Sequence, residues 1–524
     1  MSSSVVKINA PNGRVIDLPT GLFINNEFVD SANGQTLASI NPARRSSLCR
    51  RLQQRTSTAV EAARSALNTT WAATDGTSRG KLLLKIADLV EAEQEILVTL
   101  EAMDNGKPYT QALGDIEEVF SVLRYYGGWA DKQYGQTIET GRHKFTYTVR
   151  VPVGPAEQTP LSVLYFAQLV VKAGFPPGVV NIVNGTGREA GSDLVEHPGV
   201  DKIAFTGSTL TGKAIAKAAA GTMKNVTLET GGKSPLIIFD DADLKNAVKW
   251  THYGIMGNMG QICTSTSRVF VHERVYDDFL KLFLAYTTKT SIVGDPFATE
   301  SWHGPQVSRD QYEKILSYVQ IAKDEGAMLI TGGAMAPSRP NGKGHFISPT
   351  VVGDVTPRMR IFREEIFGPF LAITKFTEED DVVSMANDSE YGLAASLFTS
   401  DVTRAMRVSD RLQAGMVWIN SSNNSDYRVP FGGVKQSGIG RELDGRVVVG
   451  MLREKGKDTL VWPVDEFLFT GGSIKIDIHG GENFTLSKAN LMVMRMGQTI
   501  PFECSDNFAK VAVLLDGEDK VTLV

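Results

Sequence analysis

The sequence is poor in cysteine, with only Cys49, Cys263 and Cys504 among 524 residues. Their odd number and wide separation argue against a disulfide framework and match no metal-ligand spacing. We therefore expect a reducing compartment and no metal site.

The sequence also lacks an excess of basic charge and any long apolar run. Lys and Arg total 54 against 59 Asp and Glu, which gives a net charge of −5. A mildly acidic surface argues against nucleic acid or an anionic membrane as a partner. The first residues, MSSSVVKINAPNG, lack the apolar core of a secretory signal, and no segment is long enough to span a bilayer. A cytoplasmic location is expected.

The length exceeds what one hydrophobic core supports, so two or three domains are expected. In the first part of the chain, alternation around Asn-Asn predicts a hairpin over 21–29 and a second, extended hairpin over 136–153. Apolar residues recur at helical spacing between these hairpins. The resulting helix predictions are 58–72, 78–103 and 115–134.

From Pro160 onward, helices and strands alternate over short connections. The pattern predicts a helix in LSVLYFAQLVVKA, a strand in VVNIVNG, a helix through Leu194 and a strand in DKIAFTG. A second such series runs from about Ser234 to about Leu443. Strands that alternate with helices in this way predict an α/β fold with parallel sheets.

Two segments differ from this pattern. Residues 44–55, RRSSLCRRLQQR, contain five arginines and are interpreted as a solvated basic loop. Residues 463–524 are strand-like and interrupted by glycines, as in FLFTGGSIKIDIHGG. We interpret them as an appended β-rich segment of unassigned purpose.

Two residues are candidates for catalysis. Cys263, in GNMGQICTSTSR, follows a glycine-rich turn that allows a substrate and backbone N–H groups to approach the sulfur. The plain alternative is a small buried hydrophobic residue. Glu229, in TLETGGKSP, is either a capping carboxylate or a general base beside a pocket.

Two further motifs are candidates for nucleotide binding. FTGSTLTGK, residues 205–213, places Gly207, Ser208 and Gly212 at a strand-to-helix turn, where backbone N–H groups can face a phosphate. Its spacing is neither a P-loop nor GxGxxG, so alone it is weak evidence. In REEIFGPF, an acid such as Glu365 is suited to accept hydrogen bonds from ribose hydroxyls, although a surface turn is the plain alternative.

The order of the blocks LETGGKSP, GQICTSTSR, EEIFGPF and PFGGVKQSGIGRE resembles the aldehyde dehydrogenase superfamily. The resemblance extends from about Leu22 to about Trp462 and includes INNEFVDS, MDNGKP, PAEQTPLS and FTGST. It implies an α/β fold with a Rossmann-type cofactor domain, an α/β catalytic domain and oligomerisation strands. The implied boundaries are 1–230 for the dinucleotide-binding domain, 231–462 for the catalytic domain with its C-terminal oligomerisation strand, and 463–524 for the appended segment. The hairpin at about 136–150 would join subunits into a homodimer or homotetramer.

The resemblance also implies the chemistry and the role of each residue. Cys263 stands where the family keeps its nucleophile, and Glu229 where it keeps the base that activates water. The remaining residues match cofactor contacts: Gly207 and Ser208 at the pyrophosphate, Glu365 and Phe367 at the nicotinamide ribose and ring, and Glu157 at the adenosine ribose. Gly212 is a further expected cofactor-binding residue. An acid at position 157 repels a 2′-phosphate, so NAD is expected rather than NADP. The substrate implied is a small-molecule aldehyde.

The sequence departs from the family between Gly154 and Pro155. Members of the family have several tens of residues there, including the asparagine that holds the developing oxyanion, and this chain runs straight on. The gap, the 44–55 stretch and the tail are consistent with a diverged paralogue or a wrongly assembled reading frame. Two alternatives to an active dehydrogenase therefore stay open: a catalytically impaired binding or scaffold subunit of the same fold, and an esterase that needs no nicotinamide.

Overall fold

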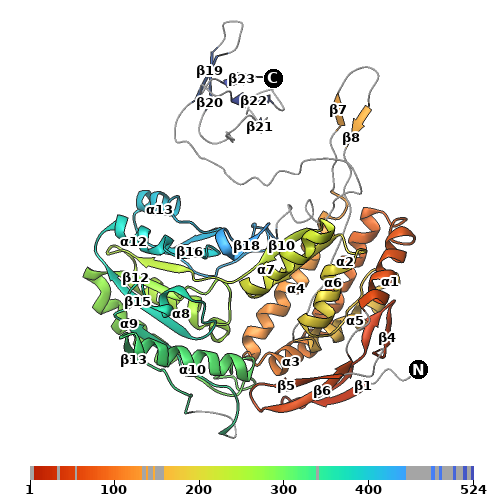
Figure 1. Ribbon diagram of the computed structural model, residues 1–524, viewed down its shortest axis with the longest axis horizontal. Coiled ribbons are helices and arrows are strands. Elements are labelled where there is room, and N and C mark those ends of the chain that lie inside the picture. Colours follow the sequence, from red (N-terminus) through yellow and green to blue (C-terminus); the bar gives the residue numbers. More distant parts are fainter. Residues whose placement is uncertain are drawn as a thin grey trace. The chain divides into compact units, whose positions relative to one another are not determined.

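The computed structural model describes residues 5–31, 36–52, 56–132, 137–139, 145–147, 159–337 and 342–443, together with five short strands beyond residue 473. The chain divides into two compact units, Met1–Gly456 and Lys457–Val524 (Figure 1). Glu157, the junction between Gly154 and Pro155, and residues 456–462 lie outside the described residues.

The chain begins with three antiparallel strand pairs. They are β1 (Val5–Asn9) with β2 (Val15–Pro19), β3 (Leu22–Ile24) with β4 (Glu27–Val29), and β5 (Thr36–Asn41) with β6 (Ser46–Leu52). The second pair confirms the hairpin predicted over 21–29, with Asn25 and Asn26 in left-handed conformation at its turn.

The prediction of a solvated loop over 44–55 is wrong, because residues 46–52 form strand β6. A two-stranded ribbon leaves one face open to water, so arginine can occupy such a strand without burying its charge. The arginine content was therefore not evidence against a strand.

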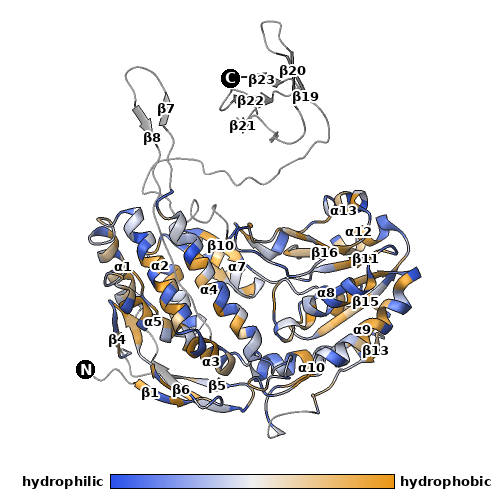
Figure 2. Ribbon diagram, turned by 180° about the vertical axis from the view of Figure 1, so that it is seen from behind, coloured by the Kyte–Doolittle hydropathy of each residue, from blue (hydrophilic) through white to orange (hydrophobic). Residues whose placement is uncertain are grey.

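A helical layer follows the strand pairs. Its members are α1 (Thr56–Asn68), α2 (Gly76–Ala92), α3 (Gln94–Asp104), α4 (Tyr109–Trp129) and α5 (Leu161–Ala173). The helices predicted from periodicity are confirmed, except that 78–103 is two helices separated at Glu93. Polar and apolar residues alternate along them in Figure 2. The apolar sides of α2, α3, α4 and α5 share one core with β1, β2 and β3, while α1 packs against β3 in a smaller cluster.

A βαβ unit consists of β9 (Lys202–Thr206), which confirms the strand predicted in DKIAFTG, α7 (Thr209–Ala219) and β10 (Asn225–Glu229). Strands β9 and β10 pair in parallel, and β18 (Gly438–Ile439) pairs antiparallel with the other edge of β10. The unit is preceded by a π-helical turn at Gly187–Gly191 and by α6 (Ser192–Glu196), in agreement with the helix predicted through Leu194. This arrangement brings the end of β10 next to the chain near residue 438.

The strand predicted in VVNIVNG is wrong. Ile182 makes a single isolated bridge to Phe23, and no strand is formed over residues 179–185. A strand needs a neighbour that continues the ladder on both sides of such a bridge. In the described part of the chain, β9 pairs with β10 alone, so this segment has no parallel partner beside it.

The second α/β series forms a seven-stranded sheet in the order β13-β14-β15-β12-β11-β16-β17, parallel except for β13. The strands are β11 (Pro235–Ile238), β12 (Arg268–His272), β13 (Met328–Thr331), β14 (Thr350–Gly353), β15 (Phe370–Phe376), β16 (Ala394–Phe398) and β17 (Met416–Ile419). Its central strands are fully buried, as expected for a parallel sheet covered on both faces. This sheet confirms the predicted α/β class.

Helices cover both faces of this sheet (Figure 1). One face packs on α8 (Leu244–Met256) and α9 (Tyr276–Thr290). The other packs on α10 (Arg309–Asp324), α11 (Arg360–Arg363), α12 (Glu379–Asn387) and α13 (Val402–Ser409). The strands alternate between these cores, with Ile237 on one side and Leu236 and Ile238 on the other.

The remaining strands are short. Strands β7 (Thr137–Glu139) and β8 (Phe145–Tyr147) form the hairpin predicted over 136–153. In the second unit, β19 (Ile474–Asp477) pairs with β20 (Asn483–Leu486), and β22 (Val511–Leu515) lies between β21 (Ile500–Phe502) and β23 (Val521–Leu523). Of the helices that the structure describes, none has the length and apolarity to cross a membrane.

Candidate active site

Glu229 ends strand β10 and is only 4% exposed. Within the described ranges, neither of its carboxylate oxygens has a hydrogen-bond partner. Burial raises the pKa of Glu229 to about 8, the charge of Glu442 acts in the same direction, and Arg441 opposes both. A buried carboxyl group with a pKa near neutrality and no partner is suited to exchange a proton with a ligand or with water.

The two glycines after this strand allow three segments to meet. A Cβ on Gly231 would lie 2.6 Å from Oε2 of Glu365, and a Cβ on Gly232 would lie 2.3 Å from the carbonyl oxygen of Cys263. On the other side, the hydroxyl of Ser437 donates to the carbonyl of Gly231 at 2.7 Å. Any side chain at 231 or 232 would therefore separate the strand end from the cysteine loop and from Glu365.

The loop before Cys263 has a strained backbone. Asn258, Met259 and Gly260 are all left-handed, with φ of 45°, 56° and 72°. A Cβ on Gly260 would lie 2.1 Å from the carbonyl carbon of Gly368, so only glycine fits there. The strain is held in place because the N–H of Asn258 donates to a glutamine side chain of α4 at 3.0 Å. Strained residues that their surroundings fix in this way cluster at functional sites.

The side chain of Cys263 is partly exposed. Burial raises the pKa of its thiol to about 12, and the charges of Glu365 and Glu229 act in the same direction. Backbone N–H groups of Thr264 and Cys263 lower it, as the sequence suggested, but their effect is smaller. Without a ligand, the thiol is therefore protonated at neutral pH and needs a base or a positive charge to become a thiolate.

Glu365 and Phe367 lie on the loop opposite the cysteine. Oε1 of Glu365 accepts the N–H of Gly232 at 2.9 Å. Burial raises the pKa of this carboxyl group, while the Gly232 hydrogen bond, Lys314 and Lys233 lower it. Phe367 has φ of 60°, and a side chain on α10 donates to its carbonyl at 2.7 Å. A cavity between the loops is lined by Gly232, Ile262, Ser265, Glu365, Phe367 and Phe370.

Helix α7 begins beside the same strand end. Ser208 caps it, because its Oγ accepts the N–H of Thr211 at 3.2 Å. Gly207 is tied to the site through its N–H, which donates to the carbonyl of Glu229 at 3.0 Å. Gly212 is buried, and a Cβ there would lie 2.7 Å from a threonine methyl group just after β10. Gly212 therefore lets the helix pack closely on the strand.

The structure thus gathers Glu229, Cys263 and Glu365 into one cluster, and Glu365 and Phe367 line the cavity beside it. Gly207 and Ser208 stand at the start of α7, connected to the cluster through the Glu229 backbone. The described residues contain no group of three or more His, Cys, Asp and Glu side chains arranged to hold a metal ion.

Two residues near this cluster had no role assigned from the sequence. Glu442 is half-buried, burial raises its pKa, and its charge acts on Glu229. Lys233 is 2% exposed and its Nζ has no hydrogen-bond partner in the part of the chain that the structure describes. Both stand in the blocks LETGGKSP and PFGGVKQSGIGRE, but a sequence block does not show which of its residues is buried beside a carboxylate.

Comparison with known proteins identifies the family. The profile described as "Aldehyde dehydrogenase family" matches residues 28–156 and 153–455. The chain belongs to the aldehyde dehydrogenase family. The two matched ranges meet at the place where the sequence departs from the family pattern.

Individual aldehyde dehydrogenases match over most of their length. An aldehyde dehydrogenase of Aspergillus niger is 45% identical over 479 residues, which cover 84% of this chain and 95% of that protein. The NAD+ complex of an aldehyde dehydrogenase from Bacillus cereus has a TM-score of 0.80 and 41% identity, covering 83% of this chain and 95% of that one. A betaine aldehyde dehydrogenase of Staphylococcus aureus, in complex with NAD+ and with a BME-modified cysteine, has a TM-score of 0.80 and 34% identity over 84% of this chain and 96% of that one. These similarities support aldehyde oxidation with a nicotinamide cofactor as the general activity of this aldehyde dehydrogenase.

Proposed function

We propose that the protein oxidises an aldehyde to a carboxylic acid with NAD, through a covalent intermediate on Cys263. The observation that carries the proposal is the buried, unpartnered carboxylate of Glu229 close enough to Cys263 for its charge to act on the thiol. A base and a nucleophile held together in this way are the arrangement that covalent catalysis requires. The modified cysteine of the Staphylococcus aureus relative is consistent with a reactive thiol in such a fold.

In the first step, the sulfur of Cys263 forms a bond to the carbonyl carbon of the aldehyde, and the thiol proton passes to Glu229 and then to solvent. The product is a thiohemiacetal with negative charge on the former carbonyl oxygen. When this oxygen reforms its double bond, the carbon loses a hydride with both electrons. NAD, when bound, supplies the acceptor for that hydride. A thioester remains on Cys263.

In the second step, Glu229 takes a proton from water, and the resulting hydroxide attacks the thioester carbon. The carbon–sulfur bond breaks, the acid leaves, and the thiol is restored. Glu229 can do this because burial holds its pKa at about 8, where it both accepts and releases a proton near neutral pH.

The residues present fit both the nicotinamide half and the pyrophosphate of the cofactor. The carboxylate of Glu365 is the kind of acceptor that binds ribose hydroxyls. Because Gly231 and Gly232 have no Cβ atoms, this carboxylate can lie directly against the turn. Phe367 is proposed to lie beside the nicotinamide ring. The exposed start of α7, capped by Ser208, offers the positive end of a helix to a pyrophosphate.

Other parts of the proposal rest on the resemblance. Glu157, on which the preference for NAD over NADP depends, lies outside the described residues. We also propose a 1–230 cofactor domain, a 231–462 catalytic domain, pairing of subunits through residues 136–150 into a homodimer or homotetramer, and a cytoplasmic location. If the asparagine that normally holds the oxyanion is absent, turnover should be slower by roughly 10²–10³-fold than in a complete family member.

Purified protein mixed with NAD and a panel of aldehydes tests the proposal by the absorbance of NADH. We expect NADH formation that disappears in Cys263→Ser, while circular dichroism and the melting temperature of that variant stay unchanged. Ester cleavage without NADH would instead support the esterase alternative. A stably folded protein with neither NAD binding nor ester cleavage would support the scaffold alternative.

A further inference from the structure

Lys233 is a buried cation that the proposed reaction does not use. It follows Gly231 and Gly232 directly, is 2% exposed, and its Nζ has no hydrogen-bond partner among the residues that the structure describes. An ammonium group without a partner in the interior is costly, so its retention calls for a compensating charge nearby.

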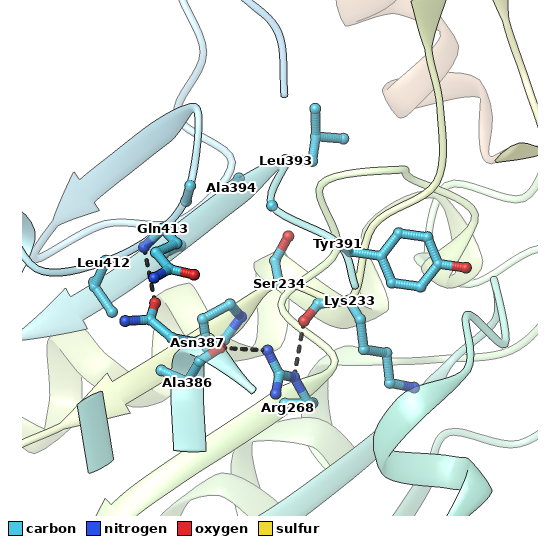
Figure 3. Close-up of a pocket in the computed structure, with 14 residues that line it drawn as sticks. Lys233, Ser234, Arg268, Ala386, Asn387, Tyr391, Leu393, Ala394, Leu412 and Gln413 are labelled. Carbon is cyan, nitrogen blue, oxygen red and sulfur yellow. Dashed lines mark hydrogen bonds between the residues drawn. The ribbon is translucent and has the colours of Figure 1, made fainter. Parts of the chain in front are cut away.

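Arg268 cannot supply this compensating charge, because it is itself a cation. Its guanidinium is itself buried and donates to the carbonyl of Lys233 at 2.9 Å and to carbonyl groups at the end of α12. Figure 3 shows the side chain of Lys233 extending away from Arg268, toward the side on which Tyr391 lies. The two positive charges repel, and Arg268 lowers the pKa of Lys233.

Two carboxylates, Glu365 and Glu364, raise the pKa of Lys233. Glu364 is already neutralised, because Arg360 donates to both of its oxygens at 2.9 and 3.0 Å and the hydroxyl of Tyr318 also donates to it. Glu365 makes no ion pair with any described residue and receives only the N–H of Gly232. The unneutralised carboxylate near Lys233 is therefore Glu365.

The backbone fixes these two groups relative to each other. Glu365 is bonded to Gly232, the residue before Lys233, and its other oxygen lies where a Cβ of Gly231 would be. Glu365 is therefore held at the turn that leads directly into Lys233. Burial drives the pKa of Glu365 upward, and the N–H of Gly232, Lys314 of α10 and Lys233 lower it, in that order. Burial likewise lowers the pKa of Lys233 to about 7, so its support for Glu365 weakens in alkaline solution.

We propose that Lys233 is a positioning residue for NAD: its buried ammonium keeps the carboxylate of Glu365 ionised and directed along the Gly231–Gly232 turn, ready to accept hydrogen bonds from the nicotinamide ribose. This inference rests on the proposed function, because it assigns Glu365 to that ribose. It goes further in making cofactor affinity depend on a residue that need not touch the cofactor.

The test is a double-mutant cycle on the full-length protein, with the dissociation constant of NAD measured by calorimetry from pH 5 to 9. In the wild type, affinity should rise as Glu365 ionises. In Lys233→Met the midpoint of that rise should move to higher pH by ~0.5–1 unit, with affinity at pH 6 weakened roughly 3–10-fold. Lys233→Arg should restore tight binding. In a Glu365→Gln background, Lys233→Met should change the affinity less than about twofold.

Lys224→Met is the matched control, because Lys224 is also buried but donates to the carbonyl of His197. Its NAD affinity should equal that of the wild type. An equal effect of Lys233→Met with and without Glu365, or an unmoved midpoint, would overturn the inference. If neither Lys233→Met nor Lys233→Gln folds while Lys233→Arg binds NAD normally with an unmoved midpoint, Lys233 is a structural residue and the inference is wrong.

These outcomes separate the inference from the function on which it rests. A wild-type protein that binds no NAD at any pH overturns the proposed function and this inference with it. A wild type that binds NAD and forms NADH, with Lys233→Met indistinguishable from it, overturns this inference alone.

Discussion

The carboxylate of Glu229 and the thiol of Cys263 are close enough for the charge of the first to raise the pKa of the second. Burial is the larger cause for both groups, and it holds each in its protonated form near neutral pH, the thiol more firmly than the acid. A positive charge placed beside the thiol would reverse this effect on Cys263. The pair is therefore arranged to become reactive when a cationic ligand binds between the loops.

Activity should depend on the ionisation of Glu229. Since its pKa lies at about 8, thioester hydrolysis should accelerate as pH rises through that value and level off above it. Glu229→Gln removes the base, so the steady-state rate should fall by roughly 10²–10⁴-fold and lose this pH dependence. A pH profile of kcat for both proteins checks this, and the first burst of NADH formation should also slow in the variant, because Glu229 takes the thiol proton in the first step. An unchanged profile would exclude Glu229 as the base.

The same group should make stability depend on pH. The folded pKa of Glu229 is raised from 4.5 to about 8, so the folded state holds a proton that the unfolded state releases between these values. Its contribution is fully present below pH 4.5 and is lost as pH rises through about 8. Glu229→Gln should therefore match the wild type near pH 4.5 and exceed its free energy of unfolding at pH 9 by up to roughly 5 kcal/mol. Urea denaturation at the two pH values measures this difference.

Substitutions at Ser208 separate helix capping from phosphate binding. Ser208→Ala removes the acceptor for the N–H of Thr211 and should lower the free energy of unfolding by about 1 kcal/mol. Ser208→Asp keeps a capping oxygen, so stability should be retained. Its negative charge would repel a pyrophosphate, and NAD affinity should fall at least tenfold. Equal NAD affinity in Ser208→Asp and the wild type would show that the start of α7 does not bind the cofactor.

The loop of Cys263 should tolerate no side chain at Gly260. Gly260→Ala forces a Cβ against the backbone of Gly368 and into a left-handed conformation, so we expect a loss of about 3 kcal/mol or more. Gly114→Ala is the control, because it lies within helix α4 with open space around it. That change should raise stability by about 0.5–1 kcal/mol. Thermal unfolding of both variants gives the comparison.

Two buried histidines should limit stability in acid. Burial lowers the pKa of His252 to about 4 and that of His303 to about 3, and neither ring nitrogen of His303 has a partner among the described residues. Because the unfolded chain takes up protons near pH 6.5 and the folded chain does not, stability falls from that pH downward. His303→Phe should reduce the slope of unfolding free energy against pH, between 6 and 4, by ~1.4 kcal/mol per unit.

Local patterns predicted most elements, and the errors have a common cause. The helix over 161–173 and strand β9 follow from the local pattern of apolar residues. VVNIVNG has the composition of a strand but no parallel neighbour, and residues 46–52 have the composition of a loop but pair with β5. Whether a segment becomes a strand depends on its partner, which lies elsewhere in the chain.

The sequence by itself determined the family, the α/β class and the residue types at the site, because ordered blocks such as GQICTSTSR and LETGGKSP are readable without coordinates. Only the tertiary structure decided the state of those residues. The pKa values of Glu229 and Cys263 come from burial and from nearby charges, which include Glu442 for the first and Glu365 for the second, each more than a hundred residues away in the sequence. The same is true of Lys233, whose exposure and lack of a partner depend on how the 231–233 turn packs against the loop of Glu365. Burial and electrostatics are properties of positions in space, so they emerge only when the chain has folded.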